Sequence, residues 1–215
     1  MAGSCNWAEK DPLFQNFHDF EWGHPVVDEQ ELFEKLCLHC QSAGGFKSEK
    51  EGEDSYDLTQ ISYLPARETY RLKFANFDPY KLVDFSLVDI DTIVEDDKAH
   101  DSDANYKHIN RNKQKLRSII TNAKAFVKMK DEGIDFSEFC WSFTNGKVII
   151  GGKSKEDLQN MAKAMSKDLK DRGFTYTTPA VCLSFMETVG MINSHAGDCQ
   201  ARSICLDEAK IFGKF

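Results

Sequence analysis

The chain has 215 residues, of which 41% are hydrophobic and 12% aromatic, and its formal net charge is −8. This composition is that of one globular domain with a sizeable core, and it excludes global disorder. No apolar run approaches the roughly 18 to 20 residues of a membrane span, and the first residues lack the pattern of a secretory signal. The seven irregularly spaced cysteines predict a reducing, intracellular setting, in the cytoplasm or in a nucleus, rather than a disulfide scaffold.

Most of the sequence has helical periodicity. We expect helices over residues 28–38, 61–74, 82–94, 113–129, 155–172 and 179–192. In the first, Asp28 is a suitable N-cap and Glu31 completes a capping box. Pro65 in the second is tolerated only in a first turn or at a break, and Gly173 ends the fifth.

The segment 113–129 is the clearest helix, because six apolar residues fall on one stripe: Leu116, Ile119, Ile120, Ala123, Phe126 and Val127. Two segments, 42–57 and 98–105, are rich in small and charged residues and are expected to be mobile inserted loops. The run KVIIGG at 147–152 is too short to imply a sheet.

The charges are unevenly distributed. Residues 106–130 contain no Asp or Glu, whereas eight positions are basic: Lys107, Arg111, Lys113, Lys115, Arg117, Lys124, Lys128 and Lys130. The preceding segment 95–103 is acidic. A cationic element on an anionic protein is typical of a phosphate-contacting patch, and a solvated helix face is the alternative that charge alone leaves open.

Cysteine and histidine residues occur near both ends of the chain. Cys5 and His18 lie near the start, and His195 and Cys199 lie four residues apart near the finish. Two thiolates and two imidazoles are a ligand set that suits a structural Zn²⁺. The spacing does not match a standard zinc finger, so two unrelated neighbourhoods remain the alternative to a metal site.

Four blocks of sequence resemble the bacterial type of DNA-3-methyladenine glycosylase I. They are CNWAEKDPLFQNFHDFEWGHPVVDEQELFEKLCLHCQSAG at 5–44, ETYRLKFANFDPYKL at 68–82, RNKQKLRSIITNAKAF at 111–126 and GFTYTTPAVCLSFMETVGMINSH at 173–195, with Cys199 following the last. The resemblance covers most of the chain except the two inserted loops and parts of 145–170. The first and last blocks are the most specific.

The resemblance implies an all-α, helix-hairpin-helix DNA glycosylase fold over residues 1–215 as a single domain. One lobe would be formed by 1–40 and 175–205 around zinc, and a helical hairpin lobe by about 58–145. The zinc would be structural and would join the two termini through residues matching Cys5, His18, His195 and Cys199. The hairpin would bind the backbone of double-stranded DNA, which assigns Arg111, Lys113, Lys115 and Arg117 to DNA contact.

The activity implied is hydrolysis of the N-glycosidic bond of an alkylated purine such as 3-methyladenine. The base is cationic while attached to its sugar and is a good leaving group, so the enzyme mainly flips the nucleotide and shelters the base among aromatic rings. The matching pocket positions are Phe14, Phe17, Trp22, His39 and Ser184. No catalytic residue is assigned. The partner is double-stranded DNA with an alkylated base, and a monomer without membrane association is expected.

The pocket positions depart from the family pattern. His39 stands where the family has a recognition glutamate, Gln60 stands where it has an aromatic residue, and Phe14 and Phe17 replace tyrosines. A neutral imidazole can read a purine edge in one tautomer, whereas a protonated one repels a cationic base. We therefore expect excision that is weak and worsens as the pH falls through the titration of His39, or a pocket retuned to another base. A partly exposed His39 without a role is the alternative.

Three functions remain open from the sequence. The first is a zinc-containing glycosylase, which the retained Trp22 and the basic hairpin exit favour. The second is a DNA-binding paralogue with weak or no base excision. The third is an interaction protein that uses the 42–57 insertion. The pair Cys37 and Cys40 resembles a redox or metal motif, but its place on an amphipathic helix favours buried apolar packing.

Overall fold

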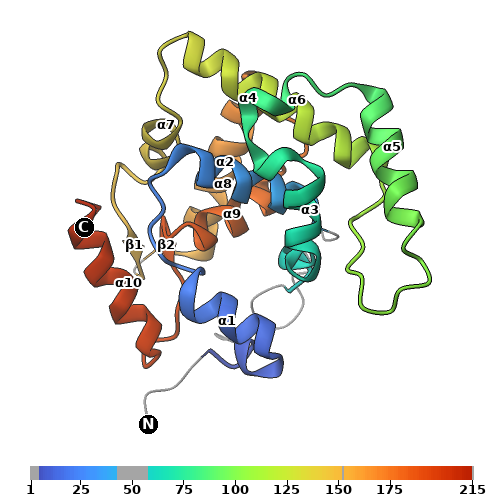
Figure 1. Ribbon diagram of the computed structural model, residues 1–215. Helices are drawn as coiled ribbons and strands as arrows, with labels where there is room; N and C mark the ends of the chain where they lie inside the picture. The colour runs from blue at the N-terminus through green and yellow to red at the C-terminus, as the bar shows by residue number, and fades with distance from the viewer. Residues whose placement is uncertain (1–4, 43–57, 152, 215) are drawn as a thin grey trace.

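The computed structural model describes residues 5–42, 58–151 and 153–214, which are mostly helical (Figure 1). The helices in the described residues are α1 Pro12–Phe20, α2 Glu29–Cys40, α3 Arg67–Lys73, α4 Pro79–Leu82, α5 Leu87–Lys98, α6 Lys113–Asp131, α7 Phe136–Ser142, α8 Lys155–Asp171, α9 Pro179–Thr188 and α10 Gln200–Ile211. Short 3₁₀ turns, η1 Ala8–Lys10, η2 Leu58–Ile61, η3 Leu64–Ala66 and η4 Ala75–Phe77, connect some of them. The expectation of a mainly helical protein is confirmed.

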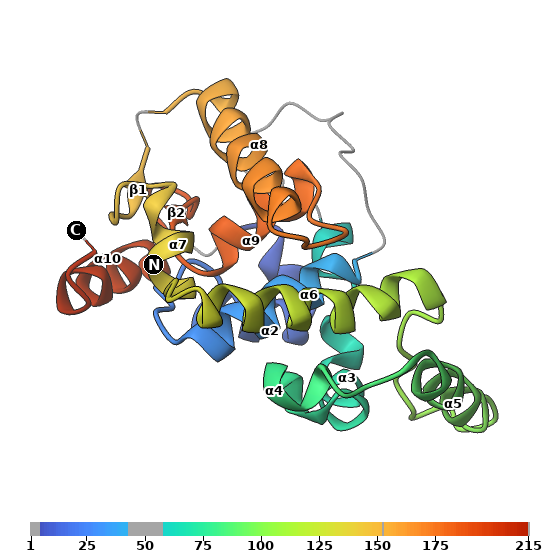
Figure 2. The ribbon, with the colours of Figure 1, turned by 90° about the horizontal axis from the view of Figure 1, so that it is seen from above.

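Helix α2 lies at the centre of the molecule. It packs against α6, α7 and α9, and residues from Leu32 to Cys40 are buried with the exception of the half-buried Glu34. Figure 2 shows the long helix α6 running along one side of α2, with α3, α4 and α5 on the far side of α6 from α8. Elements distant in sequence therefore meet around one buried helix.

The stripe predicted for 113–129 forms the buried face of α6. Leu116, Ile119 and Ala123 are fully buried, and Phe126 is nearly so, while Val127 is only partly buried against the core. Asn112 caps the helix by accepting hydrogen bonds from the amides of Gln114 and Lys115. The apolar period thus gave both the position and the orientation of this helix correctly.

Two predicted helix boundaries and one predicted capping box are wrong. Pro65 lies in a 3₁₀ turn, so the helix expected over 61–74 is reduced to α3. The helix expected over 82–94 begins only at Leu87, because Ser86 and Asp89 form a capping box there. At α2, Asp28 accepts a hydrogen bond from the Glu31 amide, but the Glu31 carboxylate pairs with Lys35 instead of returning to Asp28.

The segment expected as a helix over 179–192 divides in two. Helix α9 ends at Thr188, and strand β2 (Ile192–Asn193) then pairs in parallel with β1 (Ile149–Ile150). Gly190 permits the turn between them, since it has φ of +74° and a Cβ there would lie 2.6 Å from the carbonyl oxygen of Gly23. The run KVIIGG therefore does contribute a two-residue strand.

The two expected loops differ in outcome. Residues 43–57 lie outside the described part of the chain. The segment after α5 is ordered by charge pairs rather than loosely attached: Arg111 binds both Asp97 and Asp101, and the Asp97 carboxylate is fully buried. This segment connects α5 to the start of α6 and so fixes the basic end of α6.

Candidate metal centre and base-binding site

The four Cys and His residues at the two ends of the chain converge. The ligand atoms of Cys5, His18, His195 and Cys199 all lie within 4.8 Å of one another, and all four residues are buried. His195 Nδ1 lies 3.1 Å from His18 Nε2 and 3.8 and 3.6 Å from the Sγ atoms of Cys5 and Cys199. In tetrahedral Zn²⁺, with bonds of about 2.0–2.3 Å, neighbouring ligand atoms are roughly 3.3–3.8 Å apart. The residues fit such an ion.

The hydrogen bonds of the two imidazoles select the tautomers that a metal requires. His18 Nδ1 donates to the carboxylate of Asp19 at 2.7 Å, which leaves the Nε2 lone pair facing the cluster. His195 Nε2 donates to the carbonyl oxygen of Trp22 at 2.9 Å, which leaves its Nδ1 lone pair facing the cluster. Such outer hydrogen bonds orient metal-binding histidines in many proteins.

Trp22 packs beside this cluster. Its indole is almost fully buried, stacks on the His18 ring at 5.9 Å, and contacts His195 and Trp7 edge to face at 4.5 and 5.1 Å. The indole therefore packs against the two imidazoles of the Cys/His cluster. Its assignment to the base pocket stays a prediction.

His39 is enclosed within a buried polar cluster between α2, α9 and η2. Its Nδ1 donates a hydrogen bond to the carbonyl oxygen of Gln60 at 3.0 Å. In this tautomer Nε2 carries no proton, so it accepts a hydrogen bond from the hydroxyl of Thr188, also at 3.0 Å. The hydroxyl of Tyr63 lies 3.4 Å from the same Nε2. The hydroxyl of Ser42 also donates to the Gln60 carbonyl oxygen. His39 is fully buried, so the interpretation of a partly exposed residue is wrong.

Burial lowers the pKa of His39 from 6.5 to about 3. The hydrogen bond to Gln60 offsets only part of this effect of burial, and the charge of Lys35 lowers the pKa slightly further. The imidazole is therefore neutral at physiological pH. Any loss of excision through the titration of His39 is therefore expected only in acid, because burial moves that titration out of the neutral range.

The same shift predicts how stability depends on pH. The unfolded chain binds a proton at His39 near pH 6.5, whereas the folded chain does so only near pH 3. Acid therefore favours unfolding, and His39 contributes a loss of stability on the order of a few kcal/mol as the pH falls across this window. We expect the melting temperature of the wild type to fall more between pH 7.5 and 4.5 than that of His39→Gln, and equal slopes would contradict this.

The other predicted pocket positions lie on α1 and α9. Phe17 is buried and Phe14 is half-buried on α1. Ser184 is buried on α9, one turn before Thr188 and so on the same face as the His39 partner. Ser184 thus shares a face of α9 with Thr188, and the pocket role of Phe14, Phe17 and Ser184 stays a prediction.

The predicted DNA-contact residues at the start of α6 are largely engaged with the protein. Arg111 binds Asp97 and Asp101, and Lys113 Nζ lies 2.8 Å from Asp91. The ammonium of Lys115 donates to the carbonyl oxygen of Ser42, and burial lowers its pKa. Nε of Arg117 is buried without a hydrogen-bond partner in the described part of the chain. The role of these four residues in DNA contact stays a prediction.

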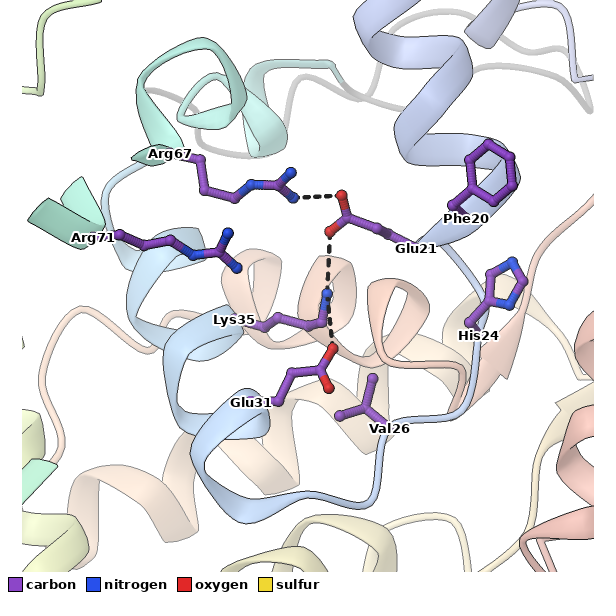
Figure 3. A pocket seen from close by; sticks show the side chains of 8 residues that line it. All are labelled: Phe20, Glu21, His24, Val26, Glu31, Lys35, Arg67 and Arg71. Carbon is purple, nitrogen blue, oxygen red and sulfur yellow. Dashed lines mark hydrogen bonds and ion pairs between the residues drawn. The ribbon is translucent and has the colours of Figure 1, made fainter. Parts of the chain in front are cut away.

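A charged pocket that sequence reasoning missed lies where α1, α2 and α3 meet. Figure 3 shows the Glu21 carboxylate between Arg67 and Lys35, with Lys35 also paired to Glu31 at 3.4 Å. Burial raises the pKa of Glu21, but Lys35 and Arg67 outweigh it and the pKa is lowered. The charges compensate one another, so this network joins three helices. The sequence signal that could have indicated this pocket is Glu21, which lies four residues before Pro25 in the first block that resembles the family.

These features define a helical protein whose two ends are joined by a buried Cys/His cluster, with a second polar cluster around the central helix. The sequence profile described as methyladenine glycosylase matches residues 7–203. Because this match covers most of the chain, the chain belongs to the methyladenine glycosylase family. The family and enzyme class expected from the sequence, a DNA-3-methyladenine glycosylase I-like hydrolase, are confirmed.

Individual relatives agree with this assignment. The DNA-3-methyladenine glycosylase of Haemophilus influenzae is 34% identical over 207 residues, covering 94% of this chain and 100% of that protein. DNA-3-methyladenine glycosylase 1 of Escherichia coli is also 34% identical, covering 91% of this chain and 94% of that one. A structure of the Staphylococcus aureus 3-methyladenine DNA glycosylase I, which concerns its recognition of 3-methyladenine, is 29% identical with a TM-score of 0.75, covering 94% of this chain and 97% of that one.

Within the described residues, every helix is too short or too polar to cross a membrane.

Proposed function

We propose that this protein is a base-excision repair enzyme that hydrolyses the N-glycosidic bond of an alkylated purine such as 3-methyladenine in double-stranded DNA. Membership of the methyladenine glycosylase family over residues 7–203 carries the proposal. Because its substrate is DNA, we propose that it acts inside the cell. We also propose that it acts as a monomer.

The neutral His39 is compatible with this chemistry. The alkylated base carries a positive charge before it is released, and an uncharged imidazole does not repel it. The half-buried ring of Phe14 offers a face on which a cationic purine can stack. The work of the protein is to hold the flipped nucleotide and to orient its bond for attack by water.

We further propose that Cys5, His18, His195 and Cys199 hold a structural Zn²⁺. With four protein ligands the site is closed, so the ion supplies stability by joining the two ends of the chain and leaves no position for substrate. The two lobes expected from the sequence, one around this ion and one formed by about 58–145, remain part of the proposal.

We also propose that α5, the segment after it and α6 form a helix-hairpin-helix unit that contacts DNA phosphates. The unit requires Lys113 to exchange its exposed partner Asp91 for a phosphate. Lys113→Gln is therefore expected to weaken DNA binding and to reduce the slope of log K against log salt by about 1. Lys167→Gln is the matched control, since Lys167 is an exposed lysine paired with Asp171 on α8. An unchanged slope for Lys113→Gln contradicts the assignment.

One observation favours the second candidate, a DNA-binding paralogue with weak or no excision. Both ring nitrogens of His39 are engaged by Gln60 and Thr188, so the ring at the expected recognition position has no free nitrogen for a base.

Release of free base from alkylated DNA separates the two candidates. The enzyme releases 3-methyladenine faster than the spontaneous rate. The paralogue binds the same duplex with a steep salt dependence and releases base only at the spontaneous rate.

A further inference from the structure

The side chain of Gln60 is buried beside His39 without hydrogen bonds. Its residue is only 5% exposed, and neither Oε1 nor Nε2 has a hydrogen-bond partner in the described part of the chain. The backbone of the same residue is fully used, because its carbonyl oxygen accepts from His39 Nδ1 and from the Ser42 hydroxyl. The backbone is therefore held in place while the carboxamide is left unpaired.

An unpaired buried carboxamide is costly to a protein. Native proteins pair most such groups, and the exceptions call for a physical explanation. Here the neighbouring His39 cannot supply a partner, since its Nδ1 is bound to the Gln60 backbone and its Nε2 to Thr188. The Gln60 side chain thus carries unused hydrogen-bonding capacity in this cluster: one acceptor oxygen and two N–H donors.

We propose that the carboxamide of Gln60 reads the edge of the flipped base. Oε1 accepts a hydrogen bond from the exocyclic amino group of an adenine-type base, and Nε2 donates to the adjacent ring nitrogen. Glutamine and asparagine recognise adenine through these two hydrogen bonds. The same edge of guanine presents two acceptors, so it can pair with the Nε2 donor of Gln60 but leaves the Oε1 acceptor without a partner. His39 is then a positioning residue that holds Gln60 through its carbonyl oxygen. This inference rests on the proposed function and names the specificity determinant of that site.

The test uses the full chain and free 3-methyladenine as the probe, with 3-methylguanine as the competitor. Gln60→Met replaces the carboxamide with an apolar side chain of similar length. We expect it to raise the melting temperature of the ligand-free protein, because the unpaired amide is removed, and to weaken 3-methyladenine binding roughly tenfold or more. The preference for 3-methyladenine over 3-methylguanine should also be lost.

Thr177→Val is the matched control. Thr177 is fully buried and its hydroxyl also lacks a hydrogen-bond partner among the described residues, but it lies just before α9 and is not one of the hydrogen-bond partners of His39. We expect it to raise the melting temperature in the same way and to leave base binding unchanged. Gln60→Asn, which retracts the carboxamide by one methylene group, should weaken base binding without the gain in stability.

The outcomes are decisive. A Gln60→Met protein that binds 3-methyladenine as the wild type does overturns the inference, and the proposed function survives if the wild type still releases base from DNA. A lower melting temperature or failure to fold in Gln60→Met shows a structural partner for the amide and also overturns the inference. A wild type that neither binds the free base nor releases it overturns the proposed function and the inference together.

Discussion

Replacing Cys199 with serine is expected to abolish stoichiometric zinc and to lower the melting temperature by tens of degrees. The thiolate is one of four buried ligands whose spacing fits a tetrahedral ion, and the ligands come from positions 5, 18, 195 and 199. Binding of a structural zinc contributes roughly 10–16 kcal/mol in small domains, as large as the total stability of about 5–15 kcal/mol of a typical protein. Loss of one ligand therefore affects the whole fold.

Cys205→Ser is the control for this substitution. Cys205 is also buried near the cluster, with Sγ 3.7 Å from His195, but it faces Nε2, the nitrogen already bonded to Trp22. We expect Cys205→Ser to retain about one zinc per chain by elemental analysis. A wild-type protein free of transition metal with an unchanged melting temperature in a strong chelator contradicts the proposed site.

Replacing His39 with leucine is expected to have the second largest effect. The substitution removes the donor to the Gln60 carbonyl oxygen and the acceptor for the Thr188 hydroxyl inside the core. We expect a loss of about 2–4 kcal/mol in the free energy of unfolding, measured with urea. Base release should fall at least about tenfold, because the segment that carries Gln60 is no longer fixed.

His39→Gln is the conservative counterpart. A glutamine side chain carries an amide NH₂ donor group and a carbonyl acceptor, so it can replace both hydrogen bonds and should recover most of the lost stability. Equal stability and equal base release in the wild type and His39→Leu contradict the positioning role.

The helices that the sequence predicted well are those whose burial is one-sided or whose ends carry strong signals. In α6 the apolar period identified the buried face, and in α8 Gly173, with φ of +97°, ends the helix as expected. Helices α1, α7 and α10 were not predicted although Asp11 and Asp135 cap the first two. They are short or amphipathic only in part, so their existence depends on contacts with the rest of the core.

The convergence of the four Cys and His residues was predictable from the sequence, because a family pattern matches thiol and imidazole groups at both ends of the chain. The environment of His39 was not predictable from the sequence. Its burial depends on Gln60, Tyr63 and Thr188, which approach it from 21 to 149 residues away, and no local pattern indicates such contacts. The correction to its pKa follows from these contacts alone.

Release of 3-methyladenine from methylated double-stranded DNA by the purified wild-type protein tests the central claim most directly. We predict liberation of the free base well above the spontaneous rate, with no His39-dependent decline between pH 8 and 6. Tight, salt-sensitive binding of the same DNA with release only at the spontaneous rate would show that the scaffold persists without the enzyme's chemistry.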